Sequence, residues 1–190
     1  MASEQDRLAL ERDVPRVSFD ALPGKLQEAL RPRYERLGYL GEFFQVAAHQ
    51  PTALLAFHRF TEALKAALPD QLTELVALTV SSRLGNHYER NQHEQLATKL
   101  GFSSAWVAEA LAGEPSAAEV LSGEERLVQS LAVAALAGEP APDQVGRAVA
   151  VLGPETTMAV LLLVGRYVAH SSVVQTLGIA PPVAPVVSAP

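Results

Sequence analysis

The fold is decided by residues 70–101, which read DQLTELVALTVSSRLGNHYERNQHEQLATKLG. Leu75 to Val80 is apolar nearly all round, which predicts a central, enclosed helix running to Leu84. Asp70 suits the N-cap of this helix, because its carboxylate can accept from the first free backbone amides. Gly85 then ends the helix.

A second helix is predicted from the cap residue Asn86 to Leu100, with Gly101 as its terminator. Asn86, Glu89 and His93 fall on the same stripe of this helix as its apolar residues, because residues three and four apart share a face. Bulky polar groups on a core stripe conflict with simple burial, which favours a functional site at this position.

The rest of the chain is predicted to be all-helical, because apolar residues recur at spacings of three and four and alternating strand patterns are almost absent. We expect about eight helices in one domain over residues 18–178, preceded by a charged lead-in at 1–17. The segment 179–190 is rich in proline and is predicted to form an extended or disordered arm. The further helices are expected at 26–38, 51–68, 103–111, 122–138, 141–152 and 154–177.

Composition limits the possible partners. The net charge of -6 and pI near 5.4 provide no basic face for nucleic acid or an anionic membrane. There is no cysteine, so disulfides, thiolate metal sites and thiol nucleophiles are excluded. The N-terminus lacks the apolar segment of a signal peptide, and the longest apolar run, 159–164, is too short to span a bilayer. We therefore expect a soluble, cytoplasmic protein.

Residues 39–101 resemble the carboxymuconolactone decarboxylase and alkylhydroperoxidase D-like proteins, in the order of an aromatic segment, Ala-His-Gln-Pro, an apolar helix and a capped motif helix. The thiol branch of that family has a glutamate, then a Cys-x-x-Cys twelve residues on, then a histidine four residues after the second cysteine. Here Glu74, Asn86, Glu89 and His93 fill those places, and Tyr88 replaces a further histidine. The pattern is similar to that of a cysteine-free branch with a Tyr-Glu pair.

The resemblance implies an all-α, alkylhydroperoxidase D-like fold and a homotrimer or homohexamer that acts on a small molecule. Without sulfur the chain cannot run a thiol peroxidase cycle. Decarboxylation, isomerisation, lactone opening or dehydration of a small oxygenated or aromatic-derived substrate needs only acid/base chemistry. We accordingly expect a lyase-, isomerase- or hydrolase-type enzyme that uses no cofactor.

Four residues are the candidate catalytic groups. His93 is predicted to be the general acid/base, since an imidazole with a pKa near 6.5 exchanges protons at neutral pH. Glu89 would orient it, or instead close a capping box with Asn86. Tyr88 would donate to a developing oxyanion, although it points about 140° from His93 on an ideal helix. Glu74 would be a second carboxylate in the proton relay, or would simply meet its helix dipole.

Asn86, His49 and Arg83 are predicted to contact the substrate, although a helix-end role is favoured for His49 and a surface role for Arg83. His170 is a further substrate-binding candidate. A metal site is disfavoured, because His87 and Glu89 point about 200° apart. Two other functions stay open: a catalytically silent oligomeric binding module in which Glu89 caps and His93 packs, and a metal-dependent oxidoreductase.

Overall fold

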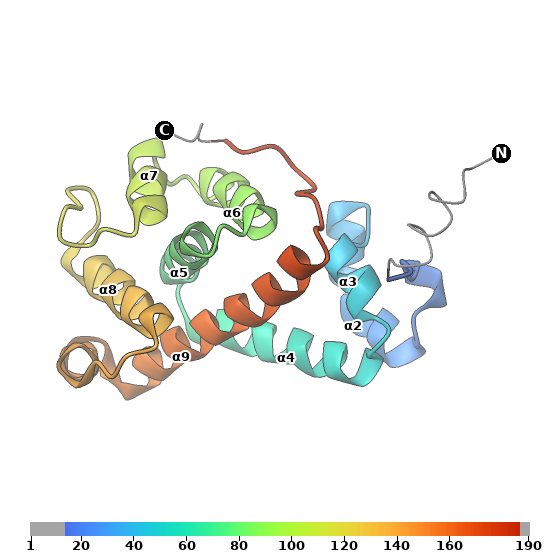
Figure 1. The fold of residues 1–190 in the computed structure, drawn as a ribbon, viewed down its shortest axis with the longest axis horizontal. Helices are drawn as coiled ribbons and strands as arrows, with labels where there is room; N and C mark the ends of the chain where they lie inside the picture. The colour runs from blue at the N-terminus through green and yellow to red at the C-terminus, as the bar shows by residue number, and fades with distance from the viewer. Residues whose placement is uncertain (1–13, 187–190) are drawn as a thin grey trace.

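The computed structural model describes residues 14–186, and within that range it is all-helical with no strand. The fold class predicted from the sequence is confirmed. Much of the predicted lead-in, 1–13, and the end of the proline-rich arm, 187–190, lie outside the described residues. The elements, drawn in Figure 1, are η1 (Phe19–Ala21), α2 (Gly24–Leu37), α3 (Glu42–Ala47), α4 (Pro51–Ala67), α5 (Asp70–Arg83), α6 (His87–Lys99), α7 (Ser104–Ala112), α8 (Gly123–Ala137) and α9 (Pro142–Thr176).

Helix α5 is the central element. Every residue from Leu72 to Ser81 is buried, and α6, α7, α8 and α9 all pack against it (Figure 1). This is what a helix apolar nearly all round requires, because it has no side to give to solvent. Its N-cap is Pro69, and Asp70 is the first helical residue with no side-chain cap bond, so the predicted Asp70 cap is wrong by one position.

Two apolar cores lie along the molecule. The larger surrounds α5 and includes Leu163 and Tyr167 of α9, and the smaller includes α2, α3 and Val174 of α9. Helix α9 therefore joins the two cores, crossing from α8 toward α2 and α3 (Figure 1). The stretch between Leu163 and Val174 lies at their junction, which is where the polar site is found.

Helix α9 was predicted as two helices, at 141–152 and 154–177. The structure confirms the break, because the two helices meet at a kink at Gly153, whose φ of 80° is non-helical. Glycine adopts a positive φ without steric cost, and Pro154 following it cannot continue the upstream hydrogen bonding. Among residues 14–186, α9 alone is long and apolar enough to cross a membrane by length and composition, criteria that a core helix also meets.

Part of the C-terminal arm, 179–186, lies along α6 without regular secondary structure. The side-chain amide of Asn91 donates to Val183 O at 2.8 Å, and Gln95 donates to Ala184 O at 3.2 Å. The backbone amide of Val186 donates to the buried Glu94 carboxylate at 2.7 Å. These contacts use the side of α6 that faces away from α5.

Candidate active site

His93 is a buried residue of α6 and is held by a carboxylate from α5. Its Nδ1 lies 2.7 Å from Glu74 Oε2, and both side chains are under 10% exposed. The contact follows from the close packing of α5 against α6, which brings two residues nineteen positions apart onto one another. A hydrogen bond of this kind fixes the ring orientation and places a proton on Nδ1.

The second ring nitrogen of His93 faces two further groups. Nε2 lies 3.1 Å from the Tyr167 hydroxyl of α9 and 3.5 Å from Glu89 Oε2. The rings of His93 and Tyr167 meet edge to face, with centroids 5.4 Å apart. Glu74, not Glu89, therefore makes the short orienting contact with His93.

Glu89 is bound mainly by side chains of α9. Arg166 Nη1 donates to Glu89 Oε1 at 2.7 Å, and His170 Nε2 lies 3.2 Å from the same oxygen. Arg166 is also held by α4, since its Nε donates to Thr61 Oγ1 at 3.3 Å and its guanidinium lies over the Phe57 ring. The carboxylate thus links α6 to α9, and through Arg166 to α4.

The cap of α6 explains why Glu89 is free to make these contacts. Asn86 Oδ1 accepts from the Glu89 backbone amide at 3.2 Å, which confirms Asn86 as the N-cap. The Asn86 backbone amide, however, donates to Ser81 O at 2.8 Å. Because that amide is already satisfied, the Glu89 side chain does not close the predicted capping box.

The charge state of His93 is set by its two carboxylates. Burial disfavours the imidazolium, but Glu74 and Glu89 outweigh burial and raise the pKa of His93 to about 9. His93 is therefore a cation at neutral pH, not the half-protonated group that its ordinary pKa suggested. Burial also raises the pKa of Tyr167 well above its usual range, so its hydroxyl stays protonated.

The other members of the cluster have fixed charges near neutral pH. Burial works against the Glu89 carboxylate, but His170 and Arg166 hold its pKa well below the usual range. Burial also works against the Arg166 cation, and Glu89 overcomes it, raising the pKa of Arg166. Burial lowers the pKa of His170 to about 4, so this imidazole is neutral and its Nε2–H donates to Glu89.

These contacts form a continuous chain of hydrogen-bonding groups. With His93 protonated, Nδ1–H donates to Glu74 and Nε2–H points toward the Tyr167 and Glu89 oxygens. When the Tyr167 oxygen accepts from His93, its own O–H remains available to donate to another acceptor. Such an array can deliver a proton from His93, directly or through the Tyr167 hydroxyl.

Tyr88 does not join this chain. Its ring belongs to the smaller apolar core, and its hydroxyl lies so close to Gly41 that a Cβ there would come within 2.9 Å of it. Burial raises the pKa of Tyr88 to about 12. As its predicted angle of about 140° from His93 suggests, Tyr88 points elsewhere, and its ring lies against that of His170 with centroids 5.5 Å apart. Tyr167 holds the place that the prediction gave to Tyr88.

The predicted substrate contacts lie at different places. Asn86 is buried beside the cluster, with Nδ2 at 3.5 Å from His170 Nδ1. His49 is exposed at the end of α3, and its Nε2 lies 2.8 Å from Pro15 O. Arg83 donates to Gly113 O at 2.8 Å and pairs with Glu114. His49 and Arg83 thus make their contacts outside the His93 cluster.

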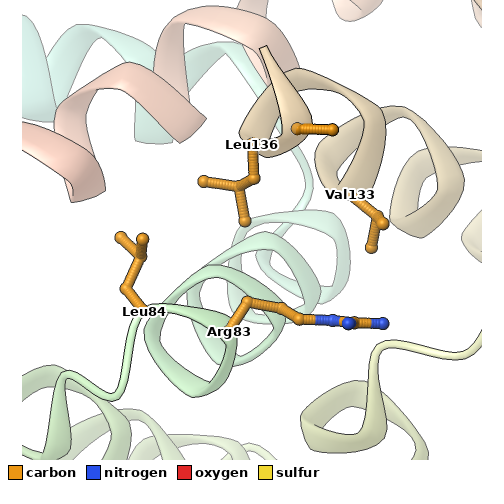
Figure 2. Close-up of a pocket in the computed structure, with 5 residues that line it drawn as sticks. Arg83, Leu84, Val133 and Leu136 are labelled. Atoms are coloured by element: carbon orange, nitrogen blue, oxygen red, sulfur yellow. The ribbon is translucent and has the colours of Figure 1, made fainter. Parts of the chain in front are cut away.

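Arg83 instead lines a cavity of about 270 Å³ between the end of α5 and α8. Figure 2 shows Arg83 and Leu84 opposite Val133 and Leu136, and Ala137 completes the lining. A second hollow, of about 400 Å³, lies beside α2 and η1, where Tyr34 and Arg16 line it. No residue of the His93 cluster lines either one.

Sequence reasoning missed Arg166 and Tyr167 and gave His170 only a minor place. A usable signal exists in the sequence, because Arg166-Tyr-x-x-His170 interrupts an apolar helix, and Arg166 and His170 share a face at a spacing of four. Within residues 14–186, no three histidine or acidic side chains form a group that could hold a metal ion.

Together, the fold and the buried cluster define an all-helical protein whose centre holds a histidine between carboxylates. A segment of the chain, residues 51–136, matches the model of the "Carboxymuconolactone decarboxylase family", and this confirms the family resemblance in a chain without cysteine. That segment holds Glu74, Glu89 and His93, whereas the α9 members of the cluster lie beyond it.

Solved structures confirm the fold across most of the chain. The alkylhydroperoxidase AhpD core of an uncharacterised peroxidase-related protein from Ralstonia eutropha JMP134 matches with a TM-score of 0.75 at 16% identity, covering 88% of this chain and 90% of that one. The debrominase Bmp8, solved as an alanine-for-cysteine variant, matches with a TM-score of 0.73 at 17% identity, covering 87% and 89%. No curated protein matches. At these identities the likeness is one of fold alone.

Proposed function

We propose that this chain is a cofactor-independent acid/base enzyme in which His93 is the proton donor. The observation that carries the proposal is the contact of His93 Nδ1 with Glu74 at 2.7 Å, combined with Tyr167 at 3.1 Å from Nε2. One side of the ring is thereby oriented by a carboxylate, and the other side is directed at a hydroxyl that stays protonated. This is the geometry of a positioned general acid.

The roles follow from the charges. Glu74 orients the imidazolium, Glu89 and Arg166 hold a fixed ion pair beside it, and Tyr167 passes or donates the proton. An acid with a pKa of about 9 protonates a developing carbanion, enolate or alkoxide at neutral pH. Decarboxylation, isomerisation, lactone opening and dehydration all need such a step. Thiol peroxidase chemistry is not proposed, because the chain contains no cysteine.

The substrate we propose is a small oxygenated or aromatic-derived molecule. The debrominase Bmp8 structure contains 2,3,4-tribromopyrrole, a small aromatic ring, on the same fold. That likeness supports a ligand of similar size, and it does not support a particular ligand chemistry. The family segment of this chain supports the same class of small-molecule enzyme.

A second function, a catalytically silent binding module, is favoured by one observation. Glu74, Glu89, His93, Arg166 and Tyr167 are each under 10% exposed, and they fill the space around one another. A packed cluster of this kind also serves as a structural ion-pair network. Catalysis therefore requires that α4 or α9 open enough to admit a substrate to Tyr167.

The test uses transfer of solvent hydrogen to carbon. The protein is incubated in D2O with a panel of lactone carboxylic acids and oxygenated ring acids, and deuterium incorporation is followed by proton NMR. We expect His93→Gln to lower incorporation by at least about a hundredfold. His87→Gln is the matched control, because His87 lies exposed on the same helix. Equal rates for both variants would refute the proposal, and no incorporation by the wild type would favour the silent module.

We also propose that the chain self-associates, as a homotrimer or homohexamer, through α9. Met158, Leu162 and Val168 are 52%, 44% and 38% exposed on one side of this helix. Leu162→Glu should convert the assembly to a 20.3 kDa monomer in light scattering, whereas Val120→Glu, an exposed loop position, should not. A wild-type protein that is monomeric at all concentrations would contradict this.

A further inference from the structure

Arg33 is a cation on the buried face of α2 whose Nε has no hydrogen-bond partner in the described part of the chain. It follows Leu26 and Leu30 at helical spacing, and those two residues are 1% and 0% exposed. Its guanidinium lies over the Phe44 ring, with the central carbon 4.8 Å from the centroid. Its Nε is fully buried with no hydrogen-bond partner, and no ion pair to Arg33 exists among residues 14–186. An unpaired buried donor of this kind costs stability.

Lys65 brings a second cation to the same place from α4. It lies on the helix stripe of Phe57 and Thr61, the two residues that hold Arg166. Lys65 is half-buried, and no hydrogen bond or ion pair to it exists in the described part of the chain. Helix α4 packs against both α2 and α9. Lys65 is near enough to Arg166 and Arg33 for each of these cations to lower its pKa, so the three positive charges influence one another.

The charges at this junction do not balance. Arg166 is satisfied by Glu89, which it shares with two histidines. Glu62 is the carboxylate with the largest electrostatic effect on Lys65, but its side chain is exposed to solvent. Burial lowers the pKa of both Arg33 and Lys65, which reflects cations removed from water without full compensation. The half-buried His58 of α4 adds no charge at neutral pH, because burial lowers its pKa, and Arg33 and Lys65 lower it further.

We propose that Arg33 and Lys65 form a binding site for the carboxylate of a small organic anion at the junction of α2 and α4. A carboxylate suits this pair, because the planar guanidinium donates two parallel hydrogen bonds and the ammonium adds a point charge. Naming that anion as the substrate rests on the proposed function, since the carboxylate would then lie beside Arg166 with its neighbouring atoms directed toward Tyr167. The anion-binding site itself does not depend on turnover.

The experiment titrates the wild-type protein with benzoate, and with benzyl alcohol as its neutral counterpart, while the Arg Nε–Hε and backbone amide signals are followed by NMR. We expect saturable benzoate shifts at Arg33 and along α2 and α4, and none with benzyl alcohol. Arg33→Gln and Lys65→Gln should each weaken binding by roughly tenfold, equivalent to about 1.4 kcal/mol. Arg36→Gln is the matched control, an exposed cation three residues along the same helix.

A further variant keeps the result decisive. Arg33→Lys preserves the charge but not the paired donors, so it should bind benzoate more weakly than the wild type and more tightly than Arg33→Gln. Saturable benzoate binding by a wild-type protein that incorporates no deuterium would refute the acid/base proposal and leave this one standing, so the two proposals fail separately. The inference is overturned if benzoate shows no saturation, if benzyl alcohol binds equally, or if Arg36→Gln weakens binding as much as Arg33→Gln does.

Discussion

Two helices of this protein begin with the same local pattern, a cap residue followed three positions later by glutamate. In α8, Ser122 accepts from the Glu125 amide at 3.2 Å and Glu125 Oε2 accepts from the Ser122 amide at 2.7 Å, which closes a capping box. In α6, Asn86 makes the first bond, but Glu89 does not make the second. The same sequence pattern therefore gives a carboxylate that caps its helix in α8 and one that does not in α6.

The partners of the two carboxylates differ in kind. Glu125 is bound by Trp106, Gln71 and a backbone amide, none of which changes charge near neutral pH. Glu89 is bound by Arg166 and lies beside two histidines. A capping pattern therefore identifies a structural carboxylate only when the backbone amide of the cap residue is free to be capped.

The largest expected effect is the loss of stability when Arg166, the ion-pair partner of Glu89, is removed. Replacing Arg166 by Met leaves Glu89 buried beside only histidines, and we expect a loss of about 3–5 kcal/mol in unfolding free energy. Urea denaturation measures it. Combining this change with Glu89→Gln should restore much of the loss, because the buried carboxylate that lost its arginine partner is then no longer charged. A loss below about 1 kcal/mol for the single variant would show that Glu89 reaches water.

The second difference is the response to alkaline pH. The pKa of His93 rises from 6.5 unfolded to about 9 folded, so its stabilising contribution is complete below pH 6.5 and is lost as the pH rises through about 9. The shift corresponds to about 3 kcal/mol. Urea midpoints measured at pH 6 and pH 9.5 should fall accordingly for the wild type and for Glu125→Gln, and remain flat for His93→Gln. A wild-type urea midpoint that does not change between pH 6 and pH 9.5 would show that His93 is not a stabilising cation in the folded protein.

The part of this arrangement that is local in sequence could be predicted. Helices α5 and α6, the Asn86 cap and the placement of Glu74 near His93 all follow from spacing within residues 70–101. The contribution of α9 could not, because Arg166 and Tyr167 lie more than seventy residues from their partners and only tertiary packing brings them there. The sequence also left open which of the two carboxylates, Glu74 or Glu89, makes the shorter contact with His93. The Glu89 side chain is not used in the cap because the Asn86 amide bonds to Ser81 O, and that bond depends on how the α5–α6 turn closes.

The third difference concerns Glu125 itself. Glu125→Gln keeps the shape but weakens charge-assisted bonds to Trp106, Gln71 and Ser122, and we expect a loss of about 1–2 kcal/mol. Because burial of Glu125 is offset by those bonds, which lower its pKa, its stabilising effect is present above the ordinary pKa of 4.5 and is lost as the pH falls. Denaturation at pH 7 and pH 4 should therefore show a smaller gap between variant and wild type at the lower pH. An equal gap at both would contradict this.

The smallest and most discriminating difference concerns the cap residues. Ser122→Ala and Asn86→Ala should each cost about 1 kcal/mol, because each removes one side-chain bond to a helix amide. Only Asn86 also touches the site, with Nδ2 3.5 Å from His170 Nδ1. Asn86→Ala should therefore shift the titration of His170, and through their shared carboxylate that of His93, in carbon-detected NMR, while Ser122→Ala leaves both unchanged. Equal shifts in the two variants would mean that the caps act only through global stability, and that Asn86 has no specific effect on the His93 cluster.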